Sequence, residues 1–192
     1  MSTMAQRFVW QRRLNQKYQE DVWKLLKDAD GEFVPPLSSR EKTTQAALAP
    51  TDGKGDARGP VKYFEQMLGQ SFVLAVKDGR VNGFLTYIPE HELSLEGRTI
   101  KCNYISTIIV EPASRRKGIT RRMYQTLFEK SLDLPVATRT WSTNHEHLGL
   151  LQKLDFSLAA RLENDRGPGI DTVYYVKKLD QGTDDHVREG KS

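Results

Sequence analysis

The sequence predicts an α/β (α+β) fold with a mixed, mostly antiparallel central sheet flanked by helices. The β-branched run of residues 105–110 has the composition of a buried strand. Asp78-Gly79 separates two apolar runs and indicates a tight hairpin turn. Several other stretches repeat apolar residues at helical spacing. Taken in chain order, the elements are β-α-α-β-β-β-α-β-α-β-β.

The first quarter of the chain predicts a strand, a helix and a long connection. Residues 7–14 form the strand, and Tyr18, Val22 and Leu26 recur every four residues on one helix face that ends at Gly31. The connection at about 34–59 holds prolines and clustered small polar residues, with one short helical piece near 40–48. A loop this long within a compact domain is either functional or a mobile insertion.

The remaining elements follow from turn and cap signals. Pro60 suits the first position of a helix that Gly69 ends, and Thr143 with Glu146 has the spacing of a capping box. Residues 89–98 are expected to be a connection between strands. The expected strands are 72–76, 81–88, 102–110, 136–140, 159–163 and 172–178, and the two later helices run from Gly118 to about 131 and from about 144 to 156.

Length and composition predict a single domain over 1–182 and a frayed tail over 183–192. The 192 residues include 38% hydrophobic ones, enough for one core, and no apolar run is long enough to span a bilayer. The first residues lack an apolar signal core, and Cys102 is the one cysteine, so we expect a cytoplasmic protein. A net charge of +4 is too weak to indicate nucleic acid by itself.

Tyr104 to Leu127 is the segment with the most specific chemistry. A strand ends at Pro112, and a helix begins at Gly118, with Ile119 and Met123 at helical spacing. Free N–H groups and the helix dipole favour an anion at such a helix start. Basic side chains surround the turn, namely Arg115, Arg116, Lys117, Arg121 and Arg122. The segment therefore predicts a phosphate-bearing ligand.

The spacing Val110-x-Pro112-x-x-Arg115-x-x-Gly118-x-Thr120 resembles motif A of the GNAT N-acetyltransferases, which bind acyl-coenzyme A. Thr120 departs from the pattern, where a residue no larger than Ala is usual. It could crowd the pyrophosphate or donate a hydrogen bond to it. The segment from Asn144 to Phe156 also resembles the family, with Asp155 in place of a Gly.

The resemblance implies a GNAT-like fold, acetyl-coenzyme A as cofactor and an amine-bearing acceptor, either a small molecule or a protein. It implies that the backbone of Ile108, Ile109 and Val110 pairs with the pantetheine arm and that Asn144 contacts the arm's far end. The pyrophosphate then falls to the turn and its basic neighbours, namely Arg115, Arg116, Lys117, Gly118, Ile119, Thr120 and Arg121.

The catalytic residues expected from the family are replaced in this chain. Tyr104 stands where histone-type members carry a glutamate, so Glu90, His91 and Glu92 are alternative bases acting through water, unless they form only a solvated acidic loop. These acidic residues hint at a cationic acceptor.

The family's usual tyrosine acid is also missing. Leu151 occupies that position, and we expect Leu151→Tyr to leave turnover unchanged or raise it. His147 and Tyr104 remain as candidate catalytic donors, although either could simply be packed. His145 and His147 lie on different helix faces, so no metal site is expected.

The leading hypothesis is a cytoplasmic acetyltransferase that transfers an acetyl group to an amine by direct attack. The replacements at Tyr104 and Leu151 motivate an alternative, a non-catalytic coenzyme A-binding or regulatory domain. A third reading, a basic nucleic-acid binder, lacks interleaved aromatic residues. We expect neither membrane nor nucleic acid as a partner, and a homodimer is one possible assembly.

Overall fold

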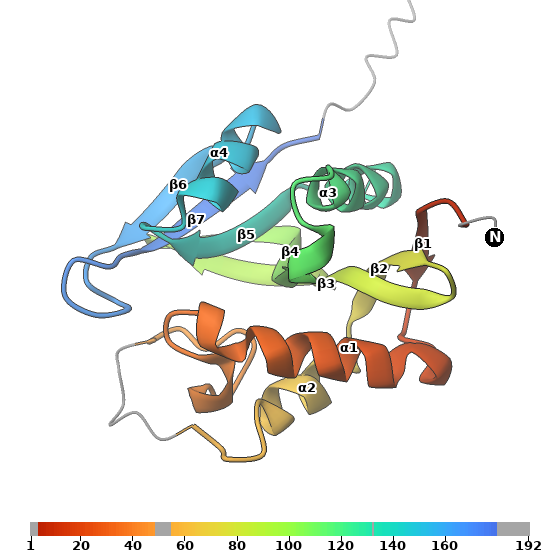
Figure 1. Ribbon diagram of the computed structural model, residues 1–192. Helices are drawn as coiled ribbons and strands as arrows, with labels where there is room; N and C mark the ends of the chain where they lie inside the picture. The colour runs from red at the N-terminus through yellow and green to blue at the C-terminus, as the bar shows by residue number, and fades with distance from the viewer. Residues whose placement is uncertain (1–3, 49–54, 132, 180–192) are drawn as a thin grey trace, which may run out of the picture.

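The computed structural model describes residues 4–48, 55–131 and 133–179. These ranges contain one seven-stranded sheet with helices on both faces (Figure 1). The strands are β1 Arg7–Gln11, β2 Ser71–Lys77, β3 Arg80–Leu95, β4 Arg98–Val110, β5 Val136–Trp141, β6 Ser157–Leu162 and β7 Thr172–Lys177. The α-helices are α1 Gln16–Ala29, α2 Val61–Met67, α3 Ile119–Lys130 and α4 His145–Lys153. Short 3-10 turns are η1 Asp30–Glu32, η2 Leu37–Ser39 and η3 Pro112–Ser114.

The predicted order of elements and the mixed sheet are confirmed. The spatial order of strands is β1-β2-β3-β4-β5-β7-β6, and each neighbouring pair is antiparallel except β4 with β5. The parallel pair requires a crossover, which α3 supplies. The boundary between the two halves of the sheet therefore lies at β4 and β5, in the middle of the molecule.

Two hydrophobic layers cover the sheet. Helices α1 and α2 pack on one face, where Val22, Leu26 and Tyr63 meet β2 and β3. Helices α3 and α4 pack on the other face, where Met123 and Leu151 are fully buried. Because strand side chains alternate between faces, each strand contributes to both layers. No helix in the described ranges combines the length and apolar composition that crossing a bilayer requires.

The prediction that residues 89–98 form a connection is wrong. Strand β3 continues to Leu95, and Glu96-Gly97 alone makes the turn to β4. Proline is tolerated in the strand because the register shifts between Ile88 and His91, which places Pro89 and Glu90 in a bulge. The Glu90 amide donates instead to the side-chain oxygen of Asn103 at 3.2 Å.

The long connection after α1 also differs from the prediction. Its helical turn is η2 at Leu37–Ser39, and no helix forms at 40–48. In that stretch the carbonyls of Thr43 and Gln45 instead accept hydrogen bonds from the Arg139 side chain of β5. Part of the predicted loop, 49–54, and the predicted tail, 183–192, lie outside the described residues.

Candidate functional site

Strands β4 and β5 are paired over only a short stretch. Asn103, Tyr104 and Ile105 pair with residues 136–138, and no pairing of the two strands follows. An extra residue in β4, Ser106, forms a bulge at the same point, since Thr86 faces Thr107 while Tyr87 faces Ile105. The strands then diverge and leave a cleft of about 810 Å³ between them. The β4 edge from 106 to 110 faces this cleft with backbone groups that a bound strand-like chain could pair with.

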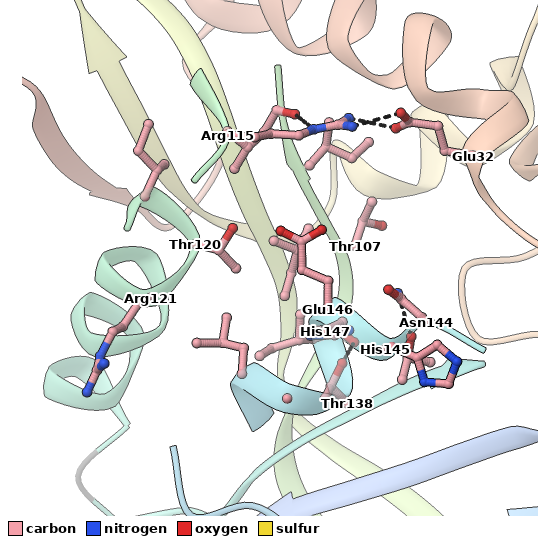
Figure 2. Close-up of a pocket in the computed structure, with 18 of the residues that line it drawn as sticks. Glu32, Thr107, Arg115, Thr120, Arg121, Thr138, Asn144, His145, Glu146 and His147 are labelled. Atoms are coloured by element: carbon pink, nitrogen blue, oxygen red, sulfur yellow. Dashed lines mark hydrogen bonds and ion pairs between the residues drawn. The ribbon is translucent and has the colours of Figure 1, made fainter. Parts of the chain in front are cut away.

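The turn that follows β4 holds the start of α3 at the mouth of the cleft. Gly118 has a left-handed conformation, φ 75°, which a residue with a side chain rarely adopts. A Cβ on Gly118 would meet nothing within 4 Å, so its backbone lies open to a ligand. The first N–H groups of α3 have no partner within the helix and carry its positive dipole end. Figure 2 shows Thr120 directing its side chain into the cleft beside them.

The basic side chains of the turn are used in different ways. Arg115 donates to both carboxylate oxygens of Glu32, at 2.9 and 2.7 Å, and to the Val110 carbonyl at 3.0 Å (Figure 2). Arg116 lines the cleft, whereas Lys117 does not line it and donates to the Ala113 carbonyl at 3.2 Å. Arg121 borders the cleft, but its side chain points away in Figure 2.

Helix α4 forms the opposite wall. The predicted capping box is wrong: Asn144, not Thr143, is the N-cap, and no side chain caps the helix. Asn144 instead donates from Nδ2 to Thr140 Oγ1 at 3.0 Å, which fixes its side chain at the edge of the cleft. Glu146, in the first turn of α4, directs its carboxylate into the cleft opposite Thr120 (Figure 2).

His147 lines the cleft and is partly buried. Its Nε2 lies 2.7 Å from the hydroxyl of Tyr124, which is buried on α3. Burial lowers the pKa of His147 to about 4, so the imidazole is neutral at pH 7. Burial also raises the pKa of Tyr124 above its usual range. A neutral imidazole that accepts from Tyr124 at Nε2 carries its proton on Nδ1 and can act only as a hydrogen-bond donor or relay.

Tyr104 does not line the cleft. It is 2% exposed and packs on the α1/α2 face with Leu93 and Tyr174. Burial raises the pKa of its hydroxyl above the usual range. The bulge at Ser106 explains the displacement, because positions counted back from the end of β4 change face at the bulge.

The three alternative bases also lie outside the cleft lining. Glu90 lies in the β3 bulge and Glu92 follows it on β3, and Glu90 pairs with Lys101 at 3.3 Å. His91 stacks on Tyr104 with ring centroids 5.2 Å apart, and burial lowers its pKa. They therefore lie on a strand rather than on the predicted loop, and none of them lines the cleft.

Leu151 is a core residue. It is fully buried in the layer under α3 and α4, beside Tyr124 and Phe156, and it does not line the cleft. A tyrosine there would have to enter a filled space with its hydroxyl. The structure therefore gives no reason to expect that Leu151→Tyr leaves turnover unchanged or raises it.

The sequence analysis did not predict several contacts at the cleft. Glu32, Arg139 and Tyr124 come from three distant segments and meet the cleft residues only through the fold. The sequence indicated Glu146 only as part of a capping box with Thr143. Among the described residues, no group of three or more His, Cys, Asp or Glu side chains could hold a metal ion.

The cleft fits an acyl-coenzyme A. The open β4 edge matches the amide-bearing pantetheine arm, and the exposed amides around Gly118 match a pyrophosphate. Arg115 is paired with Glu32, so Arg116 and Arg121 are the turn's cleft-lining cations without an ion pair in the described ranges, and Arg121 points away. The turn therefore offers an anion mainly backbone amides rather than side chains.

Comparisons with known proteins agree with this geometry. The model of the family described as "Acetyltransferase (GNAT) family" matches residues 41–156, more than half of the chain. No curated protein matches by sequence.

Solved structures share the fold at low identity. The N-acetyltransferase of Staphylococcus aureus Mu50 superposes with a TM-score of 0.62 at 17% identity, covering 91% of this chain and 99% of that one. The ribosomal-protein-alanine N-acetyltransferase of Brucella melitensis gives 0.60 at 17%, covering 92% and 100%. The yncA protein of Salmonella typhimurium, solved with its cofactor acetyl-CoA, gives 0.58 at 16%, covering 92% and 96%. By its family match, the chain belongs to the GNAT acetyltransferases, and is an acyltransferase that uses acetyl-coenzyme A.

Proposed function

We propose that the protein transfers the acetyl group of acetyl-coenzyme A to an amine of its acceptor by direct attack in the gap between β4 and β5. The observation that carries this proposal is the end of β4–β5 pairing at Ile105 and Thr138, which opens a cleft that the helix start at Gly118 also lines. A thioester held along the β4 edge would have its carbonyl at this gap. An amine could reach it from the α1/α2 face.

In this reaction the amine nitrogen forms a bond to the thioester carbon, the carbon–sulfur bond breaks, and the nitrogen loses a proton. An amine with a pKa of about 10 must be deprotonated before it attacks. We assign that proton loss to water in the open cleft, because neither Tyr104 nor the Glu90–Glu92 segment lines it. The departing thiolate is stabilised by the N–H of neutral His147 and by water in the cleft.

The proposal is tested by binding and turnover measured on the same preparation. Calorimetry should give a dissociation constant for acetyl-coenzyme A in the micromolar range, about −8 kcal/mol. An amine panel should then release free coenzyme A thiol in proportion to acetylated amine. Tight binding with no amine-dependent thiol release would contradict N-acetylation and favour the non-catalytic alternative.

We also propose that residues 1–182 act as one domain in the cytoplasm. Cys102, the one cysteine, is buried, and burial raises its pKa to about 11, so it is an inert thiol that needs no oxidising compartment. A homodimer is one possible assembly, and light scattering of the purified chain would decide it.

A further inference from the structure

Three arginines gather on the α1/α2 face of the sheet, behind the gap. Arg40 follows η2, Arg139 is on β5, and Arg166 is in the connection between β6 and β7. Arg40 and Arg166 are only 6% and 4% exposed, and Arg139 is partly buried. Thr138 and Thr140 face α3 and α4, so alternation along β5 directs Arg139 to the opposite face.

The three charges lack carboxylate partners among the described residues. None of them makes an ion pair there. Their hydrogen bonds go instead to neutral groups: Arg40 donates to the Pro35 carbonyl at 2.8 Å, and Arg166 to the Val34 carbonyl at 2.7 Å. Arg139 donates to the Gln45 carbonyl at 2.6 Å and to the Tyr174 hydroxyl at 3.3 Å.

Two carboxylates, Asp30 and Asp165, lie close enough to act on this cluster but form no ion pair with it. Asp30 accepts from the Ser38 amide and hydroxyl, at 2.7 and 2.6 Å, and Asp165 accepts from the Thr172 hydroxyl. Burial and the charges of Arg40 and Arg139 lower the pKa of Arg166 to about 9, so it is still protonated at pH 7. Buried like charges are costly unless an anion compensates them.

The arginine cluster contacts two aromatic side chains that line the cleft. Phe33 and Trp141 line the cleft with ring centroids 5.8 Å apart. The Arg40 guanidinium lies 5.9 Å from the Phe33 ring, and that of Arg166 lies 5.5 Å from the Trp141 ring. Arg139 itself lines the cleft. Arg40 and Arg166 do not line it, so a molecule with its amine at the gap would meet the Arg139 guanidinium, with the charges of the other two arginines nearby.

We propose that Arg139, with Arg40 and Arg166 behind it, binds a compact oxyanion of the acceptor, either a carboxylate or a phosphate. The acceptor is then an amine that carries an anionic group a few bonds from its nitrogen. This inference rests on the proposed function, and it replaces the cationic acceptor that the acidic residues near β4 suggested. A guanidinium recognises both oxyanions through paired N–H donors.

The test compares pairs of acceptors in which one member carries an anionic group and the other lacks it. Glycine is paired with glycinamide, β-alanine with its amide, and phosphoethanolamine with ethanolamine, and kcat/KM is measured for each. The wild type should prefer the anionic member of at least one pair more than tenfold. The first two pairs and the third pair distinguish a carboxylate from a phosphate. A preference for neutral or cationic amines throughout would overturn the inference.

Variants separate anion binding from a merely structural role of the arginines. Arg139→Gln should reduce the anionic preference at least tenfold, mainly through KM, and Arg139→Lys should retain part of it. Arg161→Gln is the matched control, because it removes the same charge from an exposed pair with Asp171. If Arg139→Gln lowers activity on both members of a pair equally, the arginine only anchors the loop, and the inference is wrong. Intrinsic differences in amine reactivity cancel in this comparison.

A second measurement decides the inference if no amine is a substrate. That result, with acetyl-coenzyme A still bound, would refute the proposed function rather than the anion site. Inorganic phosphate is then titrated with coenzyme A saturating the loop at Gly118, and thermal unfolding is followed. A rise in melting temperature in the wild type that Arg139→Gln abolishes supports the anion site. No rise in the wild type overturns it.

Discussion

The two faces of the β4–β5 gap are built in different ways. On the α3/α4 face, consecutive residues around Gly118 present backbone amides to a ligand. On the α1/α2 face, side chains from three distant segments, Arg40, Arg139 and Arg166, meet behind Phe33 and Trp141. A site made of backbone depends on one local conformation, whereas a site made of side chains depends on the whole fold. Gly118 lies inside the family match at residues 41–156, whereas Arg40 and Arg166 lie outside it.

The largest effect is expected at the backbone site. Gly118→Asp places a side chain at φ 75° and adds a negative charge beside the pyrophosphate. We expect affinity for acetyl-coenzyme A to fall at least 100-fold, about 2.7 kcal/mol, in calorimetry. Gly97→Asp is the matched control, because Gly97 has φ 81° and open space around it but lies in the β3–β4 turn. Equal affinity of Gly118→Asp and wild type would remove the turn from the cofactor site.

Leu151→Tyr tests whether the α4 wall has room for the acid that the family usually carries. Because Leu151 is fully buried, the larger ring and its hydroxyl should destabilise the fold by about 1–3 kcal/mol. Chemical denaturation measures this loss, and Leu150→Tyr, one residue earlier and partly buried at the cleft, is the control. Unchanged stability with raised turnover would show that a tyrosine can be accommodated there.

His147 tests whether the cofactor face also supplies a proton. Since a neutral imidazole is a weak acid, His147→Ala should reduce kcat less than tenfold, under about 1.4 kcal/mol of barrier. A hundredfold loss that also removes the acidic limb of the pH profile would make His147 the acid.

The same histidine gives a prediction about stability and pH. Its folded-state pKa of about 4 lies below the unfolded value near 6.5, so the unfolded chain takes up the proton first. Its contribution is present above pH 6.5 and is lost as the pH falls from 6.5 towards 4. Thermal unfolding across this window should show a smaller drop for His147→Gln than for wild type, and equal drops would contradict the shifted pKa.

Tyr63→Phe tests the bulge that opens the gap from the other face. The Tyr63 hydroxyl lies 2.7 Å from Thr107 Oγ1 and donates to the Ser106 carbonyl at 3.1 Å. Its removal should cost about 1 kcal/mol of unfolding free energy in denaturation, with acetyl-coenzyme A affinity unchanged. A large loss of cofactor affinity would mean that the two faces are not independent.

The smallest effect is expected at the ion pair that spans the two regions. Arg115 and Glu32 are both partly exposed, and such pairs contribute about 0–1 kcal/mol. Glu32→Gln should change stability little and tighten acetyl-coenzyme A at most about threefold by freeing Arg115. Weaker binding in this variant would show that the pair itself holds the turn in place.

The sequence predicted the local parts of this architecture well. The strand, the turn at Gly118 and α3 are adjacent along the chain, so composition and spacing were enough to place them. The extension of β3 through Pro89 was not predictable, because it depends on a bulge opposite β4. The bulge at Ser106 likewise moved Tyr104 out of the cleft. The arginine cluster was not predictable from a motif, since Arg40 lies about a hundred residues before Arg139, Arg166 lies 27 residues after it, and the three meet only when β5 and two loops are assembled.

The central claim is that the α3/α4 face binds acetyl-coenzyme A and the α1/α2 face binds the acceptor. It is tested most directly by initial-rate kinetics in which both substrates are varied for wild type, Gly118→Asp and Arg139→Gln. We expect Gly118→Asp to raise KM for acetyl-coenzyme A at least 100-fold and to change KM for the anionic acceptor less than about threefold. We expect the reverse for Arg139→Gln, with KM for the acceptor raised at least tenfold and KM for acetyl-coenzyme A nearly unchanged. Equal increases in both KM values in either variant would contradict it.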